Sequence, residues 1–173
     1  MKILETERLL IRKWDLGNDL EDAYAIYGDA ETMRFIPGGV KDREQVRASV
    51  ERMIQGDKRN GFGIWPVVLK ADGRVIGACG VFYIPEHEPD VEIAWVLSKD
   101  YRGRGYATEA ARAVAEYALT EYRLRVLYAI IHEENTPSIR LADRLGMKPS
   151  GTIQAYGREF GLYEMKGTGR ASQ

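Results

Sequence analysis

The chain has 173 residues, of which 45% are hydrophobic and 29% are charged, and its formal net charge is −1. This length suits one domain with a real core, and a net charge this close to zero speaks against a basic nucleic-acid-binding surface. The only cysteine, Cys79, excludes an internal disulfide and makes a metal–thiolate cluster implausible.

No apolar stretch approaches the roughly 20 residues that a membrane helix needs. The first residues, Met1 to Glu5, lack the pattern of a signal peptide. We therefore expect a cytoplasmic protein that binds neither a membrane nor a nucleic acid. Cys79 lies in the apolar run 75–82, where we expect a buried and unreactive thiol.

The first hundred residues alternate between apolar runs and amphipathic stretches. Strand patterns cover residues 9–14, 62–69, 74–84 and 91–98, and helix patterns start at Asn18 or Asp19 and at Asp42, the second running to about Gln55. Pro66 cannot donate a ladder hydrogen bond, so we expect a sheet edge or a bulge there. Ala71-Asp72-Gly73 predicts a hairpin turn between two of the strands.

The second half predicts two helices and three strands. Helices are expected over residues 108–119 and from the Asn135-Thr136-Pro137-Ser138 segment to Gly146, with Thr136 as the cap, and strands over 126–131, 148–154 and 158–166. Residues 167–173 are expected to form a flexible tail. The prediction is thus a single α/β domain over residues 1–166, with a mixed sheet of about seven strands and about four helices on its faces.

A glycine-rich turn, Arg102-Gly103-Arg104-Gly105-Tyr106-Ala107-Thr108, lies between a predicted strand and a predicted helix. Glycines allow a sharp turn and a close approach to a ligand. The free N–H groups and the dipole of the helix that follows favour a pyrophosphate, and both arginines add positive charge. Thr108 stands where a dinucleotide fingerprint needs Gly or Ala, and a P-loop lysine is missing. A solvated turn without a ligand remains the alternative at this point.

The spacing Arg-x-x-Gly-x-Ala, from Arg102 to Ala107, resembles the acyl-CoA signature of the GNAT superfamily of N-acetyltransferases. Further matching motifs follow in the order that the RimJ/RimL-type branch expects: Glu5-Thr6-Glu7-Arg8-Leu9-Leu10-Ile11-Arg12, Gly73-x-x-Ile76-Gly77, Glu92-Ile93-x-Trp95, Asn135-x-x-Ser138 and Leu145-Gly146-Met147. The resemblance covers nearly the whole chain. It implies the GNAT fold, with a mostly antiparallel sheet, and transfer of an acetyl group from acetyl-CoA to a primary amine.

The resemblance also implies a set of cofactor-binding residues. The loop from Arg102 to Thr108 would hold the CoA pyrophosphate. The strand end at Val96-Leu97-Ser98 would splay from its neighbour, so that its backbone binds the pantetheine arm and aims one N–H at the thioester carbonyl. Asn135 would contact the pantetheine arm or an ordered water, or would only open its helix.

Glu92 is the candidate general base, since a similar position holds the base in some GNAT enzymes. Strand alternation places it with Asp90 and Ala94 on one face, and partial burial would raise the pKa of its carboxyl towards neutrality. A cross-strand ion pair with an arginine is the alternative, and a water relay could take the amine proton instead.

Ser138 is the candidate group for the leaving thiolate. Many family members place a tyrosine seven residues after the asparagine, but that position is Ala142 here. The RimL-like pattern uses the serine three residues after it, which is Ser138, as a hydrogen-bond donor or general acid towards the CoA sulfur. Alternatively, this hydroxyl only satisfies a free N–H of the first helical turn.

Four aromatic residues, Phe35, Trp65, Tyr83 and Trp95, are candidates to line the acceptor pocket, although aromatic side chains often belong to the core. His87 and His132 are too scattered for a triad. The sequence leaves the acceptor open between a small amine and a protein N-terminus, and a homodimer is compatible with the family. A non-catalytic acyl-CoA-binding sensor is the competing function, and a nucleotide-binding enzyme is a weaker one.

Overall fold

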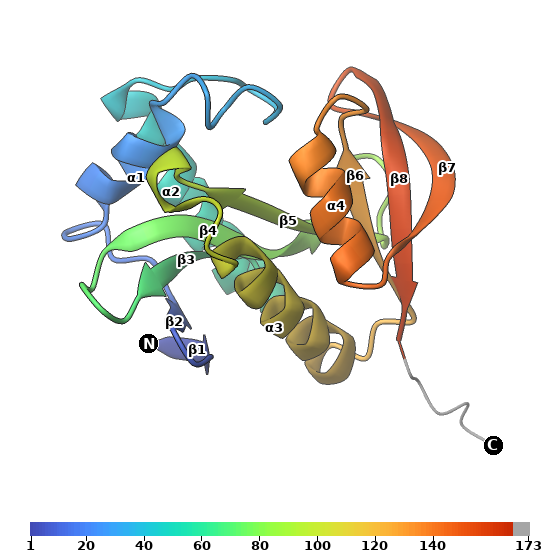
Figure 1. The fold of residues 1–173 in the computed structure, drawn as a ribbon, viewed down its shortest axis with the longest axis horizontal. Helices are drawn as coiled ribbons and strands as arrows, with labels where there is room; N and C mark the ends of the chain where they lie inside the picture. The colour runs from blue at the N-terminus through green and yellow to red at the C-terminus, as the bar shows by residue number, and fades with distance from the viewer. Residues whose placement is uncertain (168–173) are drawn as a thin grey trace.

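One eight-stranded sheet organises the fold (Figure 1). The computed structural model describes residues 1–167. In chain order the strands are β1 (Lys2–Glu5), β2 (Leu9–Arg12), β3 (Ile64–Leu69), β4 (Val75–Tyr83), β5 (Val91–Leu97), β6 (Val126–Ile131), β7 (Lys148–Ala155) and β8 (Arg158–Lys166). Their order across the sheet is β1-β2-β3-β4-β5-β6-β8-β7. Strands β5 and β6 pair in parallel, whereas the other neighbouring strands within residues 1–167 pair antiparallel. The mixed, mostly antiparallel sheet is therefore confirmed, with eight strands instead of about seven.

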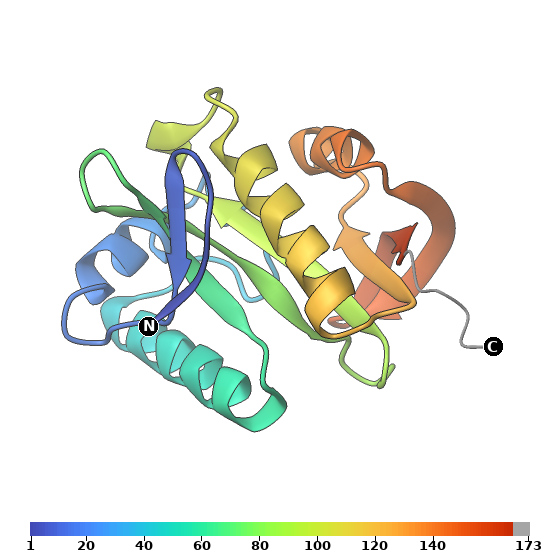
Figure 2. The ribbon, with the colours of Figure 1, turned by 90° about the horizontal axis from the view of Figure 1, so that it is seen from below.

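Four helices cover the two faces of this sheet. They are α1 (Leu20–Tyr27), α2 (Arg43–Asn60), α3 (Tyr106–Glu121) and α4 (Thr136–Arg144), and a short 3-10 turn, η1 (Lys99–Tyr101), precedes α3. Figure 2 shows α1 and α2 on one face and α3 on the other. Within residues 1–167, no helix is long and apolar enough to cross a membrane.

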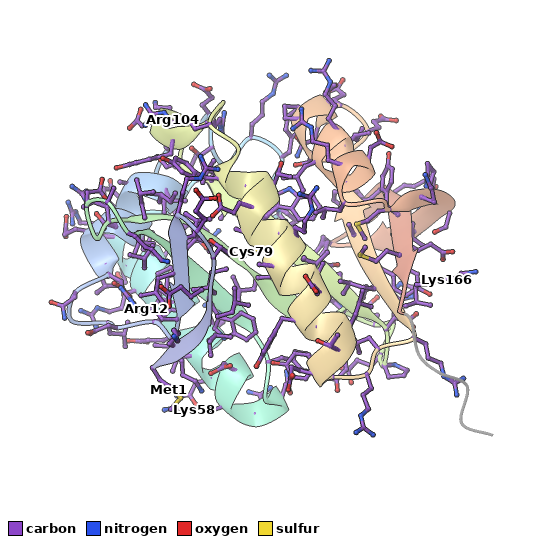
Figure 3. The ribbon with its side chains drawn as sticks, turned by 60° about the horizontal axis from the view of Figure 1, so that its bottom comes forward. Met1, Arg12, Lys58, Cys79, Arg104 and Lys166 are labelled. Atoms are coloured by element: carbon purple, nitrogen blue, oxygen red, sulfur yellow. The ribbon has the colours of Figure 1, made fainter. Side chains whose placement is uncertain are left out.

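The core has one apolar layer on each face of the sheet. Alanines and Val114 of α3 pack closely on β4 and β5, because small side chains let a helix approach a sheet. Cys79 lies in this layer beneath α3 (Figure 3), and burial raises the pKa of its thiol well above the usual range. The thiol is thus held in its protonated, unreactive form, as the sequence predicts.

The helix boundaries follow their capping chemistry, with some corrections. Asp42 accepts from the N–H of Gln45 at 2.8 Å, and the Gln45 side chain accepts from the Asp42 N–H at 2.9 Å, which completes a capping box. Helix α2 passes through Gly56 and ends at Gly61, whose φ of +75° stops it. The cap of α4 is Asn135 rather than Thr136, since the Asn135 Oδ1 accepts from Ser138 N at 3.3 Å.

One strand was not expected, and the expectation of an edge or a bulge at Pro66 is met in part. Strand β1 is missed by pattern reasoning because only four residues form it, at the sheet edge. Pro66 lies in β3, an inner strand, but β2 pairs only with residues 67–69, so its missing N–H interrupts no ladder bond with β2. A register shift follows at Val67/Val68. Of the expected tail, Gly167 donates to Arg125 O at 2.9 Å, and residues 168–173 lie outside the described part.

Candidate active site

Strands β5 and β6 separate after one paired position. Glu92 is the one residue of β5 with a register partner on β6 among the described residues. The N–H of Ser98 donates to Ile76 O of β4 at 2.9 Å, and alternation along an antiparallel ladder then turns the backbone groups of Trp95 and Leu97 towards β6. Beyond Glu92, no pairing of β6 with these groups occurs within residues 1–167, so they are available to an extended ligand.

The glycine loop leaves a set of backbone donors free at the start of α3. Gly103 and Gly105 have φ of +75° and +81°, which glycine adopts without strain. The N–H groups of residues 103–108 donate to no backbone carbonyl in the described part of the chain, and no side chain caps α3. Arg102 and, unexpectedly, Arg144 of α4 line the same hollow. Free N–H groups with two nearby cations fit a pyrophosphate.

The N-terminal motif braces this loop. Thr6 Oγ1 donates to Glu109 Oε1 at 2.6 Å, and Arg8 Nε donates to Glu109 Oε2 at 2.7 Å. Arg8 Nη1 also donates to Arg104 O at 2.8 Å, and its guanidinium stacks on the Tyr106 ring, 4.5 Å from the ring centroid. The threonine and arginine of the Glu-Thr-Glu-Arg motif thus fix the entry to α3.

Two expected cofactor residues point elsewhere. The Arg104 side chain lines a separate hollow together with Asp22, and Figure 3 shows Arg104 at the loop that leads into α3. Ser98 is buried beside that second hollow. This placement corrects the expectation that both arginines flank a phosphate: Arg102 remains on the loop hollow, where its Nη1 donates to Glu31 Oε1 at 3.1 Å.

Three hollows meet at Trp95 and Ser138, which line all of them. The first lies at the glycine loop, and the second runs between β5 and α4 past Val96, Leu97 and Asn135. We call these two together the channel. The third, the inner cavity, lies at the other end and contains Glu92. At the junction the Trp95 Nε1–H donates to Ser138 Oγ at 3.1 Å.

The inner cavity has a volume of about 250 Å³ and lies between β5, β6, the β7–β8 hairpin and the segment 35–37. Most lining side chains are apolar. Among the described residues that line it, Glu92 is the only carboxylate, and none is a lysine or an arginine. The cavity is therefore a small apolar space with one ionisable acid.

The Glu92 carboxyl is buried, with a residue exposure of 4%. Tyr156 Oη donates to its Oε1 at 3.1 Å, whereas Oε2 is buried without any hydrogen-bond partner in residues 1–167. Burial raises the pKa of Glu92 to about 8, although the Tyr156 hydrogen bond acts in the opposite direction. No ion pair with an arginine forms within this range, so the arginine alternative does not apply.

Tyr156 reaches Glu92 from the turn between β7 and β8. Its φ is +52° and that of Gly157 is +77°, the backbone of a tight two-residue hairpin turn. A tyrosine rarely adopts this conformation, and here it lets the phenol enter the cavity. Phe160 packs against the Tyr156 ring, with 6.0 Å between centroids, and supports it.

The expected aromatic lining is partly wrong. Phe35 and Trp95 line the cavity, but Trp65 and Tyr83 do not. Trp65 is 1% exposed in the core on the α3 side, and its Nε1 donates to Asp57 Oδ1 at 3.1 Å. Tyr83 packs against the same core layer. Both aromatic rings serve the core because strand alternation directs them to the face that α3 covers.

Among the cavity residues that the sequence analysis did not predict, three carry rings that face Glu92 or one another: Tyr156, His132 and Phe160. The His132 ring lies 5.0 Å from the Phe35 ring and 6.3 Å from the Phe160 ring, centroid to centroid. Its Nδ1 accepts from Glu134 N at 3.0 Å, which leaves Nε2 as the donor in the neutral ring. The Tyr-Gly pair between two strands was the available signal for a turn, but not for its approach to β5.

Comparison with known proteins agrees with this geometry. Residues 8–148 match the acetyltransferase (GNAT) domain family. The uncharacterized N-acetyltransferase YnaD of Bacillus subtilis is 36% identical over 148 residues, which cover 86% of this chain and 84% of that protein. A GNAT-family acetyltransferase structure from Bacillus anthracis is 31% identical with a TM-score of 0.78, over 93% of this chain and 95% of that one.

More distant structures share the fold. A RimL ribosomal L7/L12 acetyltransferase in complex with coenzyme A has a TM-score of 0.79 at 15% identity, over 96% of this chain and 98% of that one. At this identity the likeness supports the fold alone, so the RimJ/RimL-type branch is not established by it. The chain belongs to the GNAT family of acetyltransferases, and it is an acyltransferase that depends on acetyl-CoA.

Proposed function

We propose that this enzyme transfers an acetyl group from acetyl-CoA to a primary amine by direct attack. The observation that carries the proposal is the position of Glu92. Its buried carboxyl group, in which Oε2 has no hydrogen-bond partner within residues 1–167, lies in a cavity that meets the channel at Ser138. A base on one side of the junction and a hydroxyl on the other can assist amide formation from a thioester, the first by taking the amine proton and the second by stabilising the leaving sulfur.

The channel fits the donor. The uncapped N–H groups of residues 103–108, with Arg102 and Arg144, would hold the pyrophosphate. The backbone groups of Trp95 and Leu97 that face the β5–β6 split would bind the pantetheine arm and offer an N–H to a developing oxyanion. When bound, acetyl-CoA supplies an acetyl group activated as a thioester.

Glu92 would accept the proton that the attacking nitrogen loses, directly or through one water. A pKa of about 8 makes this carboxylate a much stronger base than an exposed glutamate. Its Oε2 has no other partner within residues 1–167, so it is available for the amine. In that direct attack a C–N bond would form and the C–S bond would break, while Glu92 would hold the proton that the nitrogen loses.

Ser138 would stabilise the sulfur that leaves. Its Oγ already accepts the Trp95 indole hydrogen, so the hydroxyl hydrogen is free to point into the channel. A hydrogen bond from this hydroxyl would offset the negative charge on sulfur until the sulfur is protonated. Asn135 orients Ser138 by accepting its backbone N–H at 3.3 Å.

Relatives act on more than one class of acceptor. A spermidine N(1)-acetyltransferase of Escherichia coli is 30% identical over 86 residues, half of this chain and 46% of that protein. RimL, by its name, acts on a ribosomal protein. Assignment to the RimJ/RimL-type branch, a homodimer and a cytoplasmic location remain predictions from the sequence.

Two measurements on matched variants test the proposal. Gly105→Glu should abolish acetyl-CoA binding in calorimetry, because its side chain would occupy the anion hollow. Gly73→Glu is the control, since Gly73 has a similar φ of +72° in a distant hairpin turn. Glu92→Gln should lower thiol release with an amine by roughly 100-fold at unchanged acetyl-CoA affinity. If Gly105→Glu and Gly73→Glu bind acetyl-CoA equally well, the glycine loop does not hold the pyrophosphate. If Glu92→Gln keeps the wild-type turnover, Glu92 is not the base.

A further inference from the structure

We infer that the acceptor is a primary amine on a compact apolar body, aromatic or branched aliphatic, that carries no second charge. The inference rests on the proposed function and names the substrate class of the same site. It comes from the charges, the walls and the size of the inner cavity.

The charged groups that line the cavity can pair with one amino group only. Glu92 Oε2 is the buried acceptor without a partner, and an amine N–H would satisfy it. The second ammonium of a polyamine would meet no other carboxylate among the described lining residues. The carboxylate of a free amino acid would likewise meet no lysine or arginine there. A buried charge without a partner is strongly unfavourable, so both classes are disfavoured.

The remaining polar groups of the cavity are partly engaged, and the His132 Nε2–H and the Ser138 hydroxyl hydrogen are left as donors. Tyr156 donates to Glu92, His132 Nδ1 accepts from a backbone N–H, and Asn135 Oδ1 accepts from Ser138 N. The amide groups of a peptide acceptor would therefore find few partners inside the cavity. A peptide N-terminus is disfavoured for this reason.

The walls favour an apolar body. Phe35, Trp95 and Phe160 present aromatic surface, and the Tyr156 phenol closes the space next to Glu92. A volume of about 250 Å³ lies below the roughly 300 to 1,000 Å³ that is usual for ligand pockets. The cavity therefore selects a short acceptor whose apolar part contacts these rings.

A panel of four acceptors tests the class on the full chain: 2-phenylethylamine, spermidine, phenylalanine and a tetrapeptide with an N-terminal alanine. Thiol release from acetyl-CoA gives kcat/KM for each, and calorimetry in the presence of CoA gives binding. We expect 2-phenylethylamine to exceed each of the others by about tenfold or more in kcat/KM. Phenylalanine is the sharpest comparison, because it differs from 2-phenylethylamine only by a carboxylate.

A wall variant separates the apolar contact from the chemistry. Phe35→Ala should lower the preference for 2-phenylethylamine over ethylamine by about fivefold or more, whereas Val40→Ala, at an exposed residue outside the cavity, should leave it unchanged. An unchanged preference in Phe35→Ala would count against the aromatic wall.

The two proposals fail in different ways. Preference for spermidine, phenylalanine or the peptide overturns the acceptor class and leaves acetyl transfer standing. If 2-phenylethylamine binds but no amine is acetylated, the proposed acetyl transfer is refuted and the proposed class of ligand is supported. If 2-phenylethylamine neither binds nor reacts, the acceptor class is wrong.

Discussion

As the pH rises, the Glu92→Gln variant should gain stability relative to the wild type. In the folded state the pKa of Glu92 is raised from 4.5 to about 8. Between these values the folded protein keeps a proton that the unfolded chain releases, so the free energy of unfolding of the wild type falls with rising pH. The loss begins above about pH 4.5 and is complete above about pH 8.

The magnitude follows from the interval between the two pKa values. At about 1.4 kcal/mol per pH unit, the whole interval corresponds to about 5 kcal/mol as an upper limit. Glutamine does not titrate, so Glu92→Gln lacks this loss. Its amide brings a constant cost, because two buried N–H donors need acceptors. The decisive quantity is therefore the pH dependence of the difference in the free energy of unfolding between the wild type and Glu92→Gln.

Urea unfolding from pH 5 to pH 9 measures that change. We expect the wild type to lose about 2–4 kcal/mol relative to Glu92→Gln over this range. Glu133→Gln is the matched control, since Glu133 is exposed on the loop before α4. If the wild type and Glu92→Gln follow parallel pH curves, the carboxyl is not held protonated by burial, and its proposed tuning as a base is wrong.

Three further predictions concern the groups around the reaction. Tyr156→Phe removes the hydrogen bond that lowers the pKa of Glu92, so the midpoint at which kcat/KM rises with pH should move to higher pH; a shift to lower pH would refute this role. Glu109→Gln loosens the brace on the glycine loop and should weaken acetyl-CoA binding in calorimetry by about tenfold, whereas the exposed Glu116→Gln should not. Ser138→Ala should lower kcat by roughly tenfold or more with little change in KM, and a change confined to KM would make its hydroxyl a binding group only.

The donor side of the site could be predicted because its signals are local. Gly103, Gly105 and the helix that follows are adjacent in the sequence, and their geometry depends on neighbouring backbone. The direction of a side chain was harder to predict from the sequence. Arg104 is next to the loop glycines, yet it lines a separate hollow and not the one at the glycine loop.

The acceptor side depends on contacts between distant residues. Tyr156 and Glu92 are 64 residues apart, and only the packing of the β7–β8 hairpin beside β5 and β6 brings them together. Trp65 was misplaced for the opposite reason: an aromatic strand residue can face either side of the sheet, and α3 covers the side that it faces. Alternation gives two faces but does not say which one a helix covers.

A crystal structure of the protein with bound CoA tests the central claim most directly, because that claim is a channel that leads from the glycine loop to Glu92. The claim predicts a pyrophosphate on the N–H groups of residues 103–108 and a sulfur within hydrogen-bond reach of Ser138 Oγ, facing the inner cavity. A CoA molecule whose sulfur lies away from the junction of Trp95 and Ser138 would contradict it.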